Sequence, residues 1–125
     1  MKMKKKILVV DDEVMVRVVL RKILIKEGYK VLSARDGERA IKKIENEEFD
    51  LVLLDLKMPG IDGMETLEKI RKINKNIPVI LISGYLTNEK VERATKLGIS
   101  DYIEKPFNLH EVELKTRRAL IKRND

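Results

Sequence analysis

The sequence predicts an α/β fold, in which one parallel five-stranded sheet is covered by helices on both faces. Two observations support this prediction. Five short and largely apolar runs recur along the chain, and the stretches between them have the apolar spacing of helices. A chain of 125 residues has the length of one ordinary domain and can bury a substantial core. We therefore expect a single domain over residues 1–125.

The predicted strands and helices alternate strictly along the chain. The strands are KILVV (6–10), KVLSA (30–34), LVLLD (51–55), PVILIS (78–83) and DYIEK (101–105). The helices fall at about 13–27, 37–47, 62–74, 87–97 and 108–123. Because crossovers between parallel strands are right-handed, five such units favour a flavodoxin-like (βα)5 three-layer sandwich with strand order 2-1-3-4-5.

Turn and capping residues lie at the borders of these elements. Gly28 and Gly98 follow the first and fourth predicted helices, and glycine commonly ends a helix. Asp36-Gly37 opens the second helix, and Asn108 is a plausible N-cap for the last, because short polar side chains cap the first turn of a helix. No stretch rich in proline, glycine or serine interrupts the pattern, which favours one continuous domain.

The composition excludes several classes of protein. Without cysteine the chain has no disulfide and no thiolate metal site, and this fits a cytoplasmic protein. No apolar run approaches the roughly 20 residues of a membrane span. The net charge of +6 comes from lysines and arginines that are spread among acidic residues. We therefore expect a solvated surface, and no direct nucleic acid binding.

Charged and polar residues follow four of the five predicted strands. Asp11 and Asp12 follow the first strand, and Asp55 ends the third. Ser83 ends the fourth strand and Lys105 ends the fifth. The carboxyl ends of parallel strands meet at one edge of a sheet, where such folds bind their ligands. Three carboxylates, one hydroxyl and one ammonium therefore converge at this edge.

Three close carboxylates repel one another, and a cation relieves that repulsion. Because the available ligands are oxygens, the sequence indicates a hard ion such as Mg²⁺. The ammonium of Lys105 supplies a second positive charge. A metal, an ammonium and a hydroxyl around one carboxylate are typical of phosphoryl transfer. Asp55, at the end of the central strand, is then the nucleophile that forms an acyl phosphate.

Four stretches of the chain resemble the motifs of two-component response regulator receiver domains, in order and at that family's spacing. They are ILVVDDE, FDLVLLDLKMPGIDG, PVILISG and DYIEKPF, with SARDGERA as a further match. The resemblance covers essentially the whole chain and is closest to single-domain regulators of the chemotaxis and sporulation type. It implies a signalling switch, not an enzyme, that accepts a phosphoryl group from a histidine kinase or histidine phosphotransfer protein. The implied output is a downstream protein target or a fused output domain.

The resemblance also implies a role for each residue of the acidic site. Asp55 matches the phosphoacceptor. Asp12 matches the direct Mg²⁺ ligand, and Asp11 matches the acid that binds the ion through water. The backbone carbonyl of Lys57 matches a further ligand. Lys57 and Tyr85 fall at positions that vary in the family, beside the acyl phosphate, and are expected to tune its lifetime.

The remaining implied roles concern the switch. Lys105 matches the phosphate-binding lysine, which a cis peptide bond joins to Pro106. Ser83 matches the switch hydroxyl, and Tyr102 matches the aromatic residue that rotates inward when that hydroxyl engages phosphate. The surface of the fourth helix, fifth strand and fifth helix is expected to change with them.

The first predicted helix carries two apolar stripes at 100° per residue. The predicted core stripe is Val16, Val19, Leu20, Ile23 and Leu24. The opposite side carries Val14, Val18 and Ile25. Receiver domains dock their kinases or phosphotransfer helices against this helix, so the resemblance implies a partner surface. Exposed aliphatic residues without a partner are the equally weighted alternative.

Two other functions remain open at this point. A phosphohydrolase with an aspartyl nucleophile needs a second acid beside Asp55, but Leu56 and Lys57 follow; sustained turnover of a phosphomonoester would favour it. A nucleotide or flavin module needs a glycine-rich loop after the first strand, where Asp11 and Asp12 stand instead. A yellow protein, or tight nucleotide binding without Mg²⁺, would favour that reading. The sequence also leaves open the output, the oligomeric state and whether the chain is free-standing.

Overall fold

The computed structural model describes the backbone of residues 3–124 and the side chains of residues 3–121. The strands are β1 (Lys6–Val10), β2 (Lys30–Ala34), β3 (Leu51–Leu54), β4 (Val79–Ser83) and β5 (Asp101–Glu104). The helices are α1 (Val14–Lys26), α2 (Gly37–Asn46), α3 (Gly63–Ile73), α4 (Asn88–Lys96) and α5 (Leu109–Asn124). Each differs from its predicted range by at most one residue at either end.

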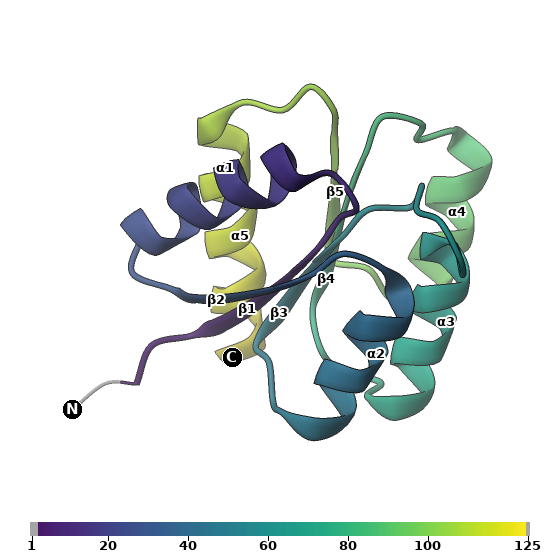
Figure 1. The fold of residues 1–125 in the computed structure, drawn as a ribbon, viewed down its shortest axis with the longest axis horizontal. Helices are drawn as coiled ribbons and strands as arrows, with labels where there is room; N and C mark the ends of the chain where they lie inside the picture. The colour runs from purple at the N-terminus through teal and green to yellow at the C-terminus, as the bar shows by residue number, and fades with distance from the viewer. Residues whose placement is uncertain (1–2, 125) are drawn as a thin grey trace.

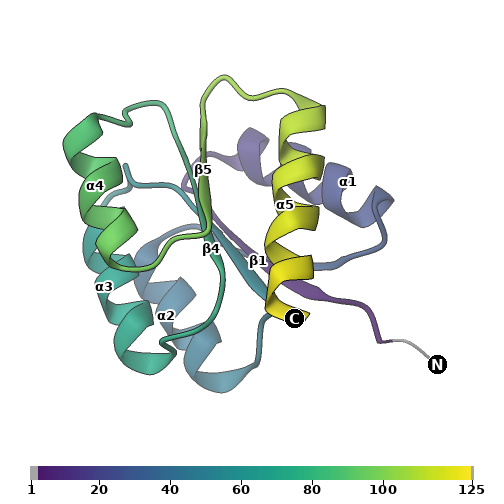
Figure 2. The ribbon, with the colours of Figure 1, turned by 180° about the vertical axis from the view of Figure 1, so that it is seen from behind.

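All five strands run parallel in the order β2-β1-β3-β4-β5, which confirms the predicted flavodoxin-like topology. Helices α1 and α5 cover one face of the sheet, and α2, α3 and α4 cover the other (Figures 1 and 2). Residues of β1 alternate between the two cores. Ile7 and Val9 pack with the residues of α1 and α5, whereas Leu8 and Val10 pack with those of α2 and α3. This period of two is what a strand buried on both faces requires.

The predicted N-cap at Asn108 is confirmed, and Asp36, predicted only to open α2, also caps its helix. The Asp36 side chain accepts a hydrogen bond from the Arg39 N–H at 2.8 Å, and the Asn108 side chain accepts one from the Glu111 N–H, also at 2.8 Å. Gly28 and Gly98 have φ angles of +96° and +77° after α1 and α4. Side chains with a Cβ adopt this region at a cost, which explains glycine at both helix ends.

Helix α1 exposes more apolar surface than its pattern predicts. Leu20, Ile23 and Leu24 are buried, and Val14, Val18 and Ile25 are exposed as expected. The assignment of Val19 to the core stripe is wrong, because its side chain is 40% exposed. At 100° per residue Val19 lies at the border of the buried stripe, and the sheet and α5 do not reach around to cover it. Among residues 3–124, no helix combines the length and apolar character needed to cross a membrane.

Candidate functional site

Strand pairing brings the three aspartates together at the carboxyl edge of the sheet, the upper edge in Figure 1. The Asp11 N–H donates to the Ala34 carbonyl at 3.1 Å, and the Asp55 N–H donates to the Val10 carbonyl at 2.9 Å. Both acids therefore continue the ladder one residue beyond their strands, so Asp55 lies just past β3. Carboxylate oxygens of Asp11, Asp12 and Asp55 all lie within 4.8 Å of one another. Asp11 and Asp55 are buried, and Asp12 is exposed.

Lys105 reaches this cluster from the end of β5. Its ammonium lies 2.7 Å from Asp11 Oδ2 and 3.3 Å from Asp55 Oδ2. Glu13 Oε1 is a third oxygen, at 3.8 Å. The Lys105 N–H donates to the Ser83 carbonyl at 3.0 Å, which keeps Lys105 in register with β4. The peptide bond between Lys105 and Pro106 is cis, as the resemblance implies.

Burial and the closeness of the acidic groups together determine the electrostatics of the cluster. Burial raises the pKa of Asp55 above its ordinary value, and the Asp11 carboxylate raises it further, while the Lys57 N–H and Lys105 oppose the shift. Burial works against the charge of Lys105. Even so, its hydrogen bonds to Asp11 and Asp55 and their negative charges together raise its pKa. One ammonium thus serves two buried carboxylates, and a further cation would relieve the remaining repulsion.

The loop after β3 shapes the site around Asp55. The Lys57 N–H donates to Asp55 Oδ1 at 3.2 Å, and the Lys57 ammonium lies 4.4 Å from the centroid of the Tyr85 ring. Gly63 closes the loop, since its N–H donates to the Leu56 carbonyl at 2.9 Å. A Cβ at Gly63 would lie 2.4 Å from the Asp55 carbonyl oxygen, so only glycine fits here.

The carboxylates open onto a small hollow of about 230 Å³. It is lined by Asp12, Glu13, Asp55, Lys57, Gly84, Tyr85 and Lys105. These residues come from the loops that follow β1, β3, β4 and β5. The hollow is large enough for an ion and a small anionic group, and it is lined by both charge signs.

The two predicted switch residues lie on neighbouring strands beside the site. Ser83 is fully buried at the end of β4, and its hydroxyl accepts a hydrogen bond from the Tyr85 N–H at 3.3 Å. Tyr102 lies on β5 opposite Leu81 and is 39% exposed. The structure therefore gathers Asp11, Asp12, Asp55 and Lys105 into one cluster. Ser83 directly precedes Gly84 of the hollow, and neither Ser83 nor Tyr102 is among the residues that line it.

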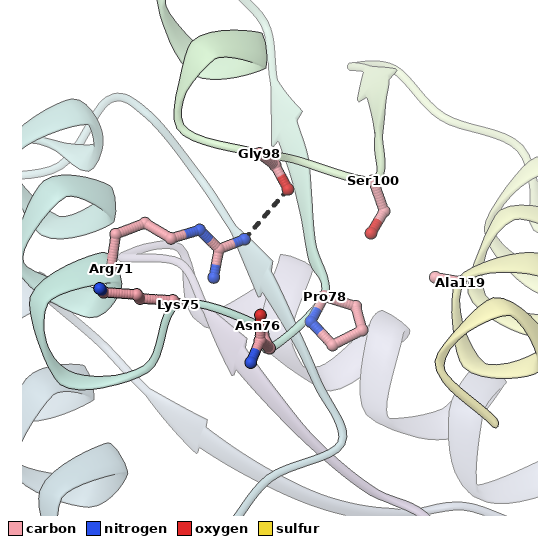
Figure 3. Close-up of a pocket in the computed structure, with 7 residues that line it drawn as sticks. All are labelled: Arg71, Lys75, Asn76, Pro78, Gly98, Ser100 and Ala119. Atoms are coloured by element: carbon pink, nitrogen blue, oxygen red, sulfur yellow. Dashed lines mark hydrogen bonds between the residues drawn. The ribbon is translucent and has the colours of Figure 1, made fainter. Parts of the chain in front are cut away.

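A second hollow, of about 510 Å³, lies at the opposite edge of the sheet, before β4 and β5 (Figure 3). Arg71 forms one wall of it. Its guanidinium donates to the carbonyls of Asn74, Ile77, Leu97 and Gly98 at 2.6–3.2 Å. Figure 3 shows the bond to Gly98. These carbonyls terminate α3 and α4 or lie just beyond them, so Arg71 joins two helix ends, and its donors are used for structure.

Sequence reasoning missed three residues around the site. Glu13 contributes the third oxygen near Lys105. Arg17 donates from its guanidinium to the Asp11 carbonyl at 2.7 Å, which fixes the backbone that carries the acid. Lys115 of α5 contacts Tyr102. The only sequence signal for Lys115 is its spacing of four residues from Glu111, which predicts a helical ion pair but not the contact with β5.

The donor set fits a hard divalent cation. Three carboxylates supply oxygens, two of them are buried, and neither cysteine nor histidine takes part. With one open side, the cluster leaves positions for water and for an oxygen of a phosphoryl group. Three carboxylates that could hold a divalent cation, with one ammonium beside Asp55, are the groups that attack by a carboxylate oxygen on phosphorus would require.

Comparisons with known proteins identify a family in which this sequence and fold occur. A family model described as the response regulator receiver domain matches residues 7–117. Sporulation initiation phosphotransferase F of Bacillus subtilis is 36% identical over 118 residues, which cover 94% of this chain and 95% of that protein. Other curated relatives are transcriptional regulatory proteins, and the chain spans only 26% to 51% of the length of those from Klebsiella oxytoca and Bacillus subtilis.

Solved structures show the same relationship. A CheY-like response regulator receiver domain protein from Methanospirillum hungatei JF-1 matches with a TM-score of 0.94 and 34% identity, over 98% of both chains. The response regulator TrrA from Thermotoga maritima was solved in complex with Mg²⁺-BeF. It matches with a TM-score of 0.84 and 39% identity, over 93% of this chain and 99% of that one.

Proposed function

Since the chain belongs to the response regulator receiver domain family of two-component systems, we propose that it is a switch operated by phosphorylation of Asp55. The observation that carries this proposal is the single cluster of Asp11, Asp12, Asp55 and Lys105. The donor is a histidine kinase or histidine phosphotransfer protein. Phosphorylation changes the binding of a downstream protein target or of a fused output domain.

In the proposed step, an Oδ atom of Asp55 attacks the phosphorus of a phosphohistidine. A P–O bond forms as the P–N bond breaks, and the imidazole nitrogen of the donor keeps the electron pair. The Lys57 N–H orients one Asp55 oxygen. Lys105, already within 3.3 Å of Asp55, balances charge on the transferred group. Hydrolysis of the acyl phosphate then resets the switch. The domain therefore acts as a signalling switch, and not as an enzyme whose role is to turn over a substrate.

Mg²⁺ is the proposed cofactor. Asp12 and Asp55 would hold it directly, Asp11 through water, and the backbone carbonyl of Lys57 would complete the protein ligands. Bound there, the ion supplies positive charge that offsets the three carboxylates and the phosphoryl oxygens. Burial, and to a smaller extent the Asp11 carboxylate, raises the pKa of Asp55, so a cation beside this carboxylate would favour its ionised form.

Ser83 and Tyr102 are the proposed switch. Ser83 is buried directly before Gly84, which lines the hollow, and Tyr102 is partly exposed one strand away. When Ser83 turns to the phosphoryl oxygens, Tyr102 rotates inward and the surface of α4, β5 and α5 changes. This is a shift between two populations, driven by contacts that the phosphoryl group makes in only one of them.

The proposed docking surface for the donor is the exposed stripe of α1, namely Val14, Val18 and Ile25. These side chains are 61%, 38% and 47% exposed. Val14 begins the helix that directly follows Asp12 and Glu13, so a partner helix seated on this stripe would have its phosphohistidine close to the hollow. Exposed aliphatic side chains on one side of a helix favour a protein partner.

Acetyl phosphate tests the proposed chemistry without a kinase. The chain is incubated with acetyl phosphate and Mg²⁺, and its intact mass is then measured. We expect one phosphoryl adduct in the wild type and none in Asp55→Asn or with excess chelator. An adduct that survives in Asp55→Asn would contradict the proposal, as would an unmodified wild type. Sustained release of phosphate from a phosphomonoester would instead favour an aspartyl phosphohydrolase.

A further inference from the structure

Lys115 holds the backbone of Tyr102 and lies over its ring. From α5, its ammonium donates to the Tyr102 carbonyl at 2.6 Å and lies 5.4 Å from the ring centroid. The same ammonium is 3.0 Å from Glu111 Oε2 and 3.5 Å from Asp101 Oδ1. The Lys115 side chain is only 22% exposed, whereas Tyr102 is 39% exposed.

These contacts fix where the positive charge sits. Glu111 is one turn before Lys115 on α5, and Asp101 precedes Tyr102 on β5, so three oxygens from two elements surround the ammonium. An ammonium near an aromatic ring is attracted by the electrons of its face. Because the ammonium is held by the backbone and by two carboxylates, it cannot follow the ring when the ring turns.

We propose that Lys115 is a positioning residue that holds Tyr102 in its outward, resting orientation. The inference rests on the proposed phosphorylation switch and names the contact that restrains it. The ring loses its cation when it rotates inward toward Ser83, while the ammonium remains with Glu111, Asp101 and the Tyr102 carbonyl. Lys115 therefore stabilises the resting population more than the activated one.

The proposal fixes the direction of an affinity change. A contact made only in the resting population weakens the binding of any ligand that favours the activated one. A partly exposed cation over a tyrosine ring corresponds to about a two- to fivefold change in equilibrium. Loss of the Lys115 ammonium should therefore tighten the binding of a phosphoryl mimic by about that factor.

The test measures the dissociation constant of beryllofluoride, in the presence of saturating Mg²⁺, by calorimetry. We expect Lys115→Met to bind it about two- to fivefold more tightly than the wild type, and Lys115→Arg to bind it like the wild type. In a Tyr102→Ala background, Lys115→Met should produce no tightening. Equal or weaker binding by Lys115→Met would overturn the proposal, and so would tightening that persists without the Tyr102 ring.

Two controls separate this role from simpler ones. The first control concerns net charge. Removal of any positive charge lowers the attraction of the protein for an anion, so this effect alone would weaken the binding of beryllofluoride, which is opposite to the expected change. Lys75→Met, at the far edge of the sheet, measures the effect of losing one positive charge. A purely structural lysine would lower the melting temperature without tightening the mimic. A third measurement uses protein labelled with 3-fluorotyrosine, in which the Tyr102 ¹⁹F resonance is the one that Tyr102→Phe removes. Without beryllofluoride, this resonance in Lys115→Met should already be shifted toward the position that it has in the wild type with beryllofluoride bound. An unmoved resonance would overturn the proposal.

Binding of beryllofluoride by the wild type distinguishes a failure of the proposed function from a failure of the role proposed for Lys115. A wild-type chain that does not bind beryllofluoride with Mg²⁺ would overturn the proposed function and this inference with it. A wild-type chain that binds the mimic, with no gain in Lys115→Met, would overturn only the assignment of Lys115.

Discussion

The ammonium of Lys105 lies 2.7 Å from the Asp11 carboxylate, although 94 residues separate them in the chain. The common direction of the strands explains the contact, because β1 and β5 both end at the same edge of the sheet, although β3 and β4 lie between them. The Lys105 side chain is 16% exposed and that of Asp11 is 2% exposed, so the pair is largely shielded from water. The Lys105 ammonium therefore balances part of the negative charge that the fold buries at Asp11.

Loss of the Lys105 ammonium should destabilise the metal-free protein. Lys105→Met leaves Asp11 and Asp55 buried without their cation, which we expect to lower the free energy of unfolding by about 1–3 kcal/mol. Urea unfolding in chelator measures this. Mg²⁺ should restore part of the loss, because it supplies positive charge to the same carboxylates.

A matched control for Lys105 is Lys69, whose ammonium is 3.6 Å from Glu65 and whose side chain is 48% exposed. Lys69→Met should change the free energy of unfolding by less than about 0.5 kcal/mol. Equal effects of the two substitutions would show that the site does not depend on Lys105 for charge balance.

Asp55→Asn should stabilise the metal-free protein at neutral pH. The pKa of Asp55 is raised in the folded state by burial and by Asp11, so its ionised form costs stability. That cost appears as the pH rises through the unfolded pKa of about 3.9 and is complete above the folded pKa. We expect a gain of about 1 kcal/mol at pH 7 that shrinks as the pH falls toward 4.

Thermal unfolding of both proteins across this pH range, in chelator, checks the sign. The difference in melting temperature should be largest at neutral pH and should narrow with acid. In Mg²⁺ the order should reverse or the gap should close, because the wild type gains more from the ion. A variant that is less stable than the wild type in chelator at pH 7 would refute the assigned cause of the shift.

Gly63→Ala should damage the loop that follows Asp55, the proposed phosphoacceptor. The new Cβ would lie 2.3 Å from Leu56 Cα and 2.4 Å from the Asp55 carbonyl oxygen, so the backbone must shift. We expect a loss of about 2–4 kcal/mol in unfolding free energy and slower phosphorylation by acetyl phosphate. Gly84→Ala is the control for the free energy of unfolding alone, because its Cβ would meet only Lys105 Cβ, at 4.0 Å, among the described residues outside its own chain neighbours. Equal tolerance of both substitutions would mean that the loop is not tightly packed.

Polar substitution of the α1 stripe should slow phosphotransfer from a protein donor only. In a triple variant that carries Val14→Gln, Val18→Gln and Ile25→Gln, we expect roughly tenfold slower transfer from a histidine kinase that phosphorylates the wild type. The rate with acetyl phosphate should not change, since the small donor needs no docking surface. Ile73→Gln, an exposed aliphatic on α3, is the control. An unchanged kinase rate in the triple variant would remove this surface from the account.

The fold and the acidic cluster could be predicted because both follow from local patterns. Apolar runs of strand length, helical spacing between them and turn residues at the borders define the elements. Parallel topology then brings every strand end to one edge, which places Asp11, Asp55 and Lys105 together without further information. The cis bond before Pro106 accompanies the family's motif and was expected from the resemblance.

Features that depend on how helices pack could not be predicted. The exposure of Val19 follows from how far the sheet and α5 reach around α1, which the period of the helix does not determine. The position of Lys115 beside Tyr102 depends on the docking of α5 against β5. The four carbonyls that Arg71 joins come from segments that meet only in the folded chain.

The most direct test of the central claim locates the phosphoryl group on the chain. After reaction with acetyl phosphate and Mg²⁺, borohydride reduces an aspartyl phosphate to homoserine, and peptide mass spectrometry identifies the converted residue. We predict homoserine at position 55 and at no other aspartate. Homoserine at position 11 or 12, or a phosphorylated chain with no converted aspartate, would contradict the account.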